Sequence, residues 1–264
     1  PPRRAAVPPA DPGPARPPRS LQPLRSPRGK GALVPDPNLF RLRATYCKQG
    51  RLALLSHLEV ARALERAVRR AGLPFAVSRG FSPHMKIAFG AALPVGVGGT
   101  CELFDLQMTR YVPPDEALEA LQGASVPDLM VKACSYIGPH DAAASAAYPV
   151  GTYRALLSRA VGALSVPETV TVVRKRKERT LSVAEFLVGE PELSGAVLTF
   201  SLESKPTGSL RPDVLLRACL DEAGDEPLLS FVENAEPSSV AADASDAGRV
   251  RALSVTRIAQ RAAR

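Results

Sequence analysis

Two histidines stand among the basic residues of the chain, and their chemistry makes them candidates for acid–base catalysis. His57 begins an arginine-rich segment, and His84 follows it after a predicted extended piece and a turn. One imidazole can take a proton from an RNA 2′-hydroxyl while a second, protonated imidazole donates one to the leaving oxygen. The alternative is that both are structural, one at the start of a helix and one hydrogen-bonding a turn.

The rest of the sequence marks no other nucleophile, metal site or iron–sulfur cluster. The four cysteines are scattered without a CxxC pair, which argues against zinc, a cluster or a disulfide framework. They are Cys47, Cys101, Cys134 and Cys219. The glycine-rich residues 96–99 are not followed by the GK[ST] of a phosphate-binding loop, so we expect a loop that lets the backbone pass close to the core. We expect no metal, no cofactor and a reducing, cytoplasmic setting.

Positive charge gathers in two places along the chain. Residues 1–37 hold twelve of the 26 prolines and a net charge of +5, and residues 41–86 carry ten Lys/Arg against Glu59 and Glu65. Residues 149–264 are neutral, with 15 basic and 15 acidic side chains. Pro-Arg-Ala repetition with few large apolar residues cannot offset its own ordering entropy, so we predict a disordered tail at residues 1–37.

The basic patch is centred on a predicted helix. Ser56 followed by Glu59 is a capping box, and the helix runs from about His57 to Ala71 before Gly72 and Pro74 end it. At 100° per residue, apolar side chains share one helix face and four arginines share the other. A row of guanidinium groups suits phosphate contacts, although an ordinary solvated face is the alternative. The candidates for nucleic-acid binding, with the turn that follows, are Arg62, Arg66, Arg69, Arg70, Arg79 and Lys86.

The elements around this helix follow the order β-α-β-β-α-β. The predicted strands and extended pieces are 40–46, 75–78, 86–89, 101–108 and 126–137. A second helix opens at Pro113 and Pro114. This order is that of the ferredoxin-like fold, so we expect an α+β protein with a ferredoxin-like first lobe at residues 38–137. Asp105 alternates with apolar neighbours and is expected on the exposed face of its strand.

After a linker at residues 138–148, a second and more degenerate ferredoxin-like lobe is expected at residues 149–264. Its predicted elements are strands at 153–159, 196–203 and 250–258, a hairpin of 169–174 with 181–186, and a helix at 212–223. The helix that should follow the first strand is poorly signalled. The acidic, Ser/Ala-rich residues 234–248 predict a flexible insertion, and the basic run Arg174–Arg179 predicts a hairpin tip in water, with RNA contact as the alternative.

Residues 54–59 and 61–74 form one segment, and residues 78–89 and 92–96 form a second. Together they resemble the radical-SAM-linked protein family, a bacterial domain of unknown function found fused to radical SAM proteins or encoded beside them. That family usually shows Ser-His-Leu-Asp and Phe-Asn-Pro-His-Pro-Lys where this chain has Ser-His-Leu-Glu59 and Phe-Ser82-Pro-His-Met85-Lys. The motif positions that are kept are Ser56, His57, Gly80, Phe81, Pro83, His84 and Lys86. The resemblance is specific over residues 41–108 and looser through about 220 residues.

The resemblance implies partnership with a radical SAM enzyme and, from the RNA-related neighbours of that family, an RNA substrate. It supplies no reaction, and the chain has no CxxxCxxC motif for a radical SAM cluster, so a separately encoded partner is expected to hold that chemistry. We therefore expect a non-catalytic accessory protein that binds RNA or an RNA–protein complex. We do not expect it to bind a membrane. The alternatives are a metal-independent ribonuclease that uses His57 and His84, and a docking domain that binds only its protein partner.

Overall fold

A computed structural model of the chain describes residues 39–174, 177–220 and 250–263. The tail predicted at residues 1–37 and the insertion predicted at residues 234–248 lie outside this part. Within it, no helix is long and apolar enough to cross a membrane. The predicted mixture of helices and strands is confirmed.

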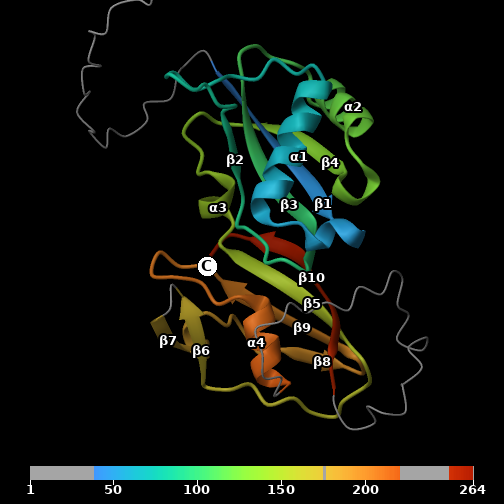
Figure 1. Ribbon diagram of the computed structural model, residues 1–264, viewed down its shortest axis with the longest axis vertical. Coiled ribbons are helices and arrows are strands. Elements are labelled where there is room, and N and C mark those ends of the chain that lie inside the picture. The colour runs from blue at the N-terminus through green and yellow to red at the C-terminus, as the bar shows by residue number, and fades with distance from the viewer. Residues whose placement is uncertain (1–38, 175–176, 221–249, 264) are drawn as a thin grey trace, which may run out of the picture. The chain divides into compact units, whose positions relative to one another are not determined.

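Eight strands form one mixed sheet to which both halves of the chain contribute (Figure 1). They are β1 (Phe40–Lys48), β2 (Ile87–Phe89), β3 (Val97–Met108), β4 (Val131–Ile137), β5 (Val150–Leu157), β8 (Glu192–Ser194), β9 (Val197–Glu203) and β10 (Ala252–Arg261). Their order is β4-β1-β3-β10-β5-β9-β8, and β2 pairs with β3 off this path. Neighbours are antiparallel except β3 and β10, which are parallel over three residue pairs. A separate hairpin consists of β6 (Thr169–Arg174) and β7 (Lys177–Ser182).

Helices α1 (His57–Arg70) and α2 (Pro114–Ala124) cover one face of the sheet in the first half of the chain (Figure 1). Their buried side chains enter a core with those of β1 and β3, including Leu64, Leu121, Leu42 and Phe104. In the second half, α4 (Pro212–Cys219) contributes Leu215 and Leu216 to another core, which it shares with β5, β9 and the β6–β7 hairpin. The remaining short pieces are α3 (Ala144–Ala147) and the 3-10 turns Gly50–Leu54, Pro127–Leu129 and Val183–Glu185.

The strand order of the first half is repeated in the second. In the first half it is β4-β1-β3-β2, and in the second it is β10-β5-β9-β8. In each half a helix also precedes the last strand of that half: α2 precedes β4, and α4 precedes β10. The halves differ after their first strand, because α1 follows β1 whereas the β6–β7 hairpin follows β5.

The basic helix forms where its local signals place it. The Ser56 side chain accepts a hydrogen bond from the backbone of Glu59, and the Glu59 carboxylate accepts one from the backbone of Ser56, so the capping box is complete. Gly72 then takes a φ of +66°, which an L side chain adopts only with strain. These contacts confirm the predicted helix to within one residue of its end.

Several predicted boundaries shift. Residues 75–78 are not a strand but make only isolated bridges, because Pro74 and the turn at 79–84 leave too few residues for a ladder. The last strand of the first half starts at Val131 after a 3-10 turn. Of the glycines in 96–99, Gly96 lies in a turn, as expected, whereas Gly98 and Gly99 lie within β3. In the second half, the partner of β6 is at 177–182 instead of 181–186, and β8 was not predicted.

Candidate functional site

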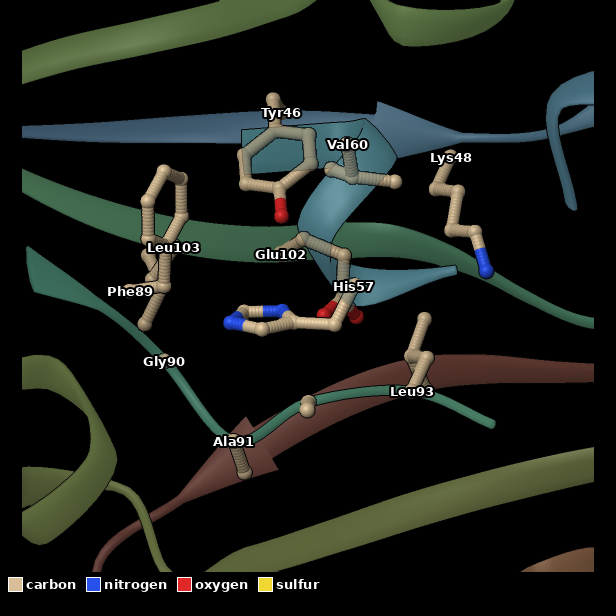
Figure 2. A pocket seen from close by; sticks show the side chains of 11 residues that line it. Tyr46, Lys48, His57, Val60, Phe89, Gly90, Ala91, Leu93, Glu102 and Leu103 are labelled. Carbon is tan, nitrogen blue, oxygen red and sulfur yellow. The ribbon is translucent and has the colours of Figure 1, made fainter. Parts of the chain in front are cut away.

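A small polar pocket lies beside the first residue of α1 (Figure 2). Its polar side chains come from three elements: Tyr46 and Lys48 from β1, His57 from α1 and Glu102 from β3. In Figure 2 the imidazole of His57 points into the space between the Tyr46 hydroxyl and the backbone at Gly90. The pocket therefore brings together four groups able to exchange or bind protons, three of which the sequence did not single out.

Glu102 is bound by an arginine from the far end of the chain. The Nε of Arg257 in β10 donates to Glu102 Oε1 at 2.8 Å, and its Nη2 donates to Oε2. Arg257 also donates to the carbonyl of Ala91 and, at 3.4 Å, to the hydroxyl of Tyr153. Burial alone lowers the pKa of Arg257, but the hydrogen bonds and charge of Glu102 outweigh it, so its pKa is raised. Arg257 is thus fully engaged within the protein.

Glycines provide the space for this ion pair. A side chain at Gly99 would overlap the carboxylate of Glu102, and one at Gly151 would come within 3.0 Å of Cδ of Arg257. The sequence predicted that the glycine-rich residues 96–99 allow a close approach of backbone to the core. The structure shows that a buried charged pair uses this space.

Lys48 is buried and bound to the backbone. Its side chain is 2% exposed, and its Nζ donates to the carbonyl of Val97 at 3.2 Å and reaches that of Pro94 at 3.5 Å. Burial lowers the pKa of Lys48 to about 8, although the negative charge of Glu102 acts in the opposite direction. Its charge therefore belongs to the interior and not to the surface patch in which the sequence count placed it.

The two candidate histidines occupy different surroundings. His57 contacts Phe89, the last residue of β2, in an edge-to-face arrangement with ring centroids 5.5 Å apart. His84 lies before β2 and is exposed. Its backbone N–H donates to Ser78 Oγ at 3.0 Å, and its carbonyl accepts from the Ser78 N–H at 2.8 Å. Phe89 lies five positions after His84 in the chain, and an extended chain covers roughly 16 Å over five positions. Among the described residues, no hydrogen bond or ring contact joins the two imidazoles.

The α1 arginines are exposed, as the helical pattern predicts. Arg69 lies 3.6 Å from Glu65 and over the ring of Phe75, and Arg70 donates to the carbonyl of Ala124. Arg62 and Arg66 form no hydrogen bond or ion pair with another residue that the structure describes. With the exposed Arg79 and the half-buried Lys86 of the following segment, these residues are called the basic surface below: Arg62, Arg66, Arg69, Arg70, Arg79 and Lys86.

The turn that carries the second motif projects into solvent. Gly80, Phe81, Pro83 and His84 are all exposed, and Phe81 is fully so. The segments on either side of the turn are joined by a hydrogen bond of 2.8 Å from the Ser78 N–H to the His84 carbonyl. Of the two motifs, the first therefore supplies a helix cap and a pocket residue, and the second supplies surface.

Asp105 corrects the expectation of an exposed side chain. It is 4% exposed, accepts hydrogen bonds of 2.7 and 2.8 Å from Arg43, and also pairs with Arg41. The backbone N–H of Ala144, the first residue of α3, donates to the same carboxylate. Alternation places Asp105 on the sheet face opposite α1, but it does not reveal that the segment around α3 covers that face. Arg41 and Arg43 are therefore engaged inside the fold and, like Lys48, do not contribute to the positive charge of the surface.

No group of three or more His, Cys, Asp or Glu side chains is placed to hold a metal ion within the described part of the chain. The cysteines are free thiols. Burial raises the pKa of the Cys134 and Cys219 thiols to about 11, so neither is a nucleophilic thiolate at neutral pH.

One signal in the sequence points to the buried pair. Glu102 lies in phase with the buried Phe104 and Leu106 of β3, where an unpaired charge would be costly. A buried charge at this position requires a partner of opposite charge. The sequence alone does not identify that partner, because Arg257 lies 155 positions after Glu102 in the chain.

The comparison with protein families gives one match. A family described as "Uncharacterized protein conserved in bacteria (DUF2344)" matches residues 41–212, which run from β1 to the first residue of α4. The matched residues include both sequence motifs, the residues that line the polar pocket, and the basic surface, whereas Arg257 lies beyond them. No curated protein matches the chain.

Proposed function

The chain belongs to this family of uncharacterized bacterial proteins, and we propose that it is a non-catalytic accessory protein that binds RNA, or an RNA–protein complex, through the basic surface. The observation that carries the proposal is the exposure of Arg62 and Arg66, neither of which forms an ion pair within 4.0 Å among the described residues. From residue 66 to residue 101 the chain has five basic and no acidic side chains. A surface of this kind favours a polyanion.

The arrangement suits phosphate contacts along a nucleic-acid backbone. Helix positions 62, 66, 69 and 70 present their side chains along one exposed face of α1, and each guanidinium offers a fork of donors that matches a phosphate. Neutralising several phosphates releases counterions, which supplies affinity without reading sequence. Arg69 and Arg70 are partly engaged by Glu65 and Ala124, so Arg62 and Arg66 carry the main expectation.

A role without catalysis is supported by the way the polar groups of the pocket are used. Arg257 and Glu102 bind each other, and Lys48 binds carbonyl oxygens of the 94–97 turn. His57 and His84, the pair required for the ribonuclease hypothesis, make no contact with each other in the described chain. These observations favour a stabilising role for the pocket.

We propose a radical SAM protein as the partner, on the strength of the resemblance of the two motifs to the radical-SAM-linked family. Because the given sequence contains no CxxxCxxC motif, we propose that this partner holds the cluster. The free cysteines fit a reducing cytoplasm.

We further infer that both halves of the chain are ferredoxin-like units. The order β4-β1-β3-β2 with antiparallel neighbours, and its repetition as β10-β5-β9-β8, support this. In the second unit the β6–β7 hairpin takes the place in the chain that α1 has in the first.

Filter binding to mixed-sequence RNA at increasing salt tests the RNA-binding function. Arg62→Glu combined with Arg66→Glu is expected to weaken binding by about tenfold or more and to make the salt dependence shallower by about one to two in slope. Lys132→Glu with Arg154→Glu is a matched control, because it makes the same change of charge at two exposed strand positions outside the basic surface. Equal affinity and salt slope in the unaltered protein and the first variant contradict the proposal.

Pull-down with the radical SAM protein encoded nearby, with and without nuclease, tests the partnership. Capture that survives nuclease supports direct docking, and capture that nuclease removes supports an RNA bridge. If the chain captures no radical SAM protein in either condition, the proposed partnership is wrong.

A further inference from the structure

Phe81 is the most exposed large apolar side chain in the described part of the protein. Its relative exposure is 105%, against 66% for Leu58 and 49% for Val77. A phenyl ring in water forgoes the stabilisation that burial gives. Packing within the fold therefore does not account for its position.

The turn that carries Phe81 is held in one conformation. The Lys86 N–H donates to the Ala76 carbonyl at 2.8 Å, and the Ser78 N–H donates to the His84 carbonyl at the same distance. Met85, between these contacts, is buried in the core of the first half. Gly80 has a φ of +148°, which lets the chain turn just before the aromatic residue. Because these hydrogen bonds close the base of the turn, its two ends need not be brought together when a ligand covers Phe81.

The surroundings of Phe81 are cationic. Arg79 in the same turn is exposed, and the guanidinium of Arg69 lies 5.7 Å from the ring of Phe75, where the chain leaves α1 for the turn. No acidic side chain occurs between Glu65 and Glu102 in the sequence. A docking site for an apolar groove would present several apolar side chains together, whereas the other exposed side chains of this turn are Arg79, Ser82, Pro83 and His84. An exposed aromatic ring two positions after an exposed arginine matches a base with its phosphate.

The geometry also distinguishes between paired and unpaired nucleotides. In a duplex both faces of each base are covered by its neighbours, and a protein can reach only base edges and the backbone. An unpaired base offers a free face, and stacking on an aromatic side chain is the usual means by which proteins hold it. Phe81 has no donor or acceptor, so such stacking would tolerate any base.

We infer that Phe81 stacks on an unpaired base of RNA, so that the turn at residues 79–84 recognises single-stranded nucleotides while the α1 arginines hold the neighbouring phosphates. This inference rests on the RNA-binding function proposed above and adds to it the form of RNA and the residue that recognises it.

Fluorescence tests the stacking directly, because the chain contains no tryptophan. In Phe81→Trp the new indole is the only one in the protein, and a short mixed-sequence single-stranded RNA is expected to quench its emission on binding. A blunt duplex of the same sequence is expected to leave the emission nearly unchanged. Val95→Trp serves as the control, since Val95 is exposed in the connection after β2 and away from the 79–84 turn in the chain.

Affinity provides a second measurement. Phe81→Ala is expected to weaken binding to the single strand by about tenfold, equivalent to ~1.4 kcal/mol, with the duplex affinity and the salt slope unchanged. Phe81→Trp is expected to retain the affinity of the unaltered protein. Only the arginine variants are expected to change the salt slope, so this measurement separates phosphate contacts from base stacking.

Three outcomes overturn the inference in distinguishable ways. If the unaltered protein binds RNA, yet Phe81→Ala binds equally well and Phe81→Trp is not quenched, the stacking is wrong and the RNA-binding function stands. If Phe81→Trp responds only to the radical SAM partner, the turn is a protein-docking element. If the unaltered protein binds neither single-stranded nor double-stranded RNA, the proposed function itself fails.

Discussion

Glu102 and Arg257 form a buried, two-pronged ion pair across the junction between β3 and β10, although 155 residues separate them in the chain. The two strands pair in parallel over only three residue pairs, from Val97 to Gly99 on β3. Arg257 extends the connection by binding Ala91 and Tyr153 as well. The ion pair therefore reinforces a short stretch of sheet through which the first half of the chain is joined to the second.

Removing one member of this pair should destabilise the protein strongly. In Glu102→Ala the guanidinium of Arg257 stays buried without its counter-charge, which costs about 3–5 kcal/mol in the free energy of unfolding. Urea unfolding measures the loss. Glu65→Ala, which removes the exposed partner of Arg69, is the control and should cost no more than ~0.5 kcal/mol. A similar small cost for both variants would show that the buried pair does not stabilise the junction.

The buried amine of Lys48 should make stability depend on pH in the alkaline range. The pKa of Lys48 is about 8 in the folded protein, against an ordinary value of 10.5 for a lysine in water, so between these values the unfolded chain binds more protons than the folded one. By linkage, the contribution of Lys48 to folding stability then rises as the pH rises from about 8 to 10.5. Below pH 8 the amine is charged in both states, and burial of that charge opposes folding.

Unfolding free energies of the unaltered protein and Lys48→Met, measured between pH 7 and 10, test this expectation. The difference between the two should shift in favour of the unaltered protein as the pH rises, because methionine has no proton to release. Arg154→Met, at an exposed strand position, controls for the loss of a positive charge. A difference that stays constant over this range contradicts the lowered pKa.

Local signals predicted α1 well, whereas long-range contacts decided the candidate site. Ser56, Glu59 and Gly72 act within a few residues of the helix ends, so their effect is visible in the sequence. The burial of Asp105 and Glu102 depends on which segments cover the two faces of β3. The two side chains lie on opposite faces of this strand, and each forms an ion pair with an arginine of another strand. Alternation indicates the face of the sheet, but only the path of the chain decides whether that face is buried.

The same reasoning applies to the basic patch. The sequence count of ten Lys/Arg in residues 41–86 includes Arg41, Arg43 and Lys48, which the fold uses internally. The arginines on α1 remain on the surface because the helical period had already assigned them a solvent-facing side. The charge summed over residues 41–86 therefore overestimates the surface charge of this part of the chain.

Asp105 should hold the segment after β4 against the sheet. Arg43 binds Asp105 and the carbonyl of Ala142, and Arg41 binds the carbonyls of Gly138 and Asp141. Asp105→Ala leaves Arg43 buried without a counter-charge, so we expect a loss of about 3 kcal/mol or more in unfolding free energy. Hydrogen exchange should rise most in residues 138–148. Asp115→Ala, at an exposed position in the first turn of α2, is the control, and uniform exchange across both variants would argue against the anchoring role.

The separation of His57 from His84 yields an expectation about catalysis. Acid–base cleavage of RNA requires both imidazoles at one phosphodiester, within hydrogen-bond reach of the 2′-hydroxyl and of the leaving oxygen. His57 contacts Phe89 at the end of β2, and His84 lies in the exposed segment before β2. We therefore expect RNA to remain intact on incubation with the purified protein and a chelator, at a concentration that saturates RNA binding.

The His84→Ala variant makes this expectation decisive. A trace of contaminating nuclease would cleave RNA equally in the unaltered protein and in His84→Ala, because the substitution does not affect it. Cleavage that occurs with the unaltered protein in chelator and disappears in both His57→Ala and His84→Ala would mean that RNA binding brings the two histidines together. In that event the turn at residues 79–84 would have to move on binding, and the protein would be an enzyme after all.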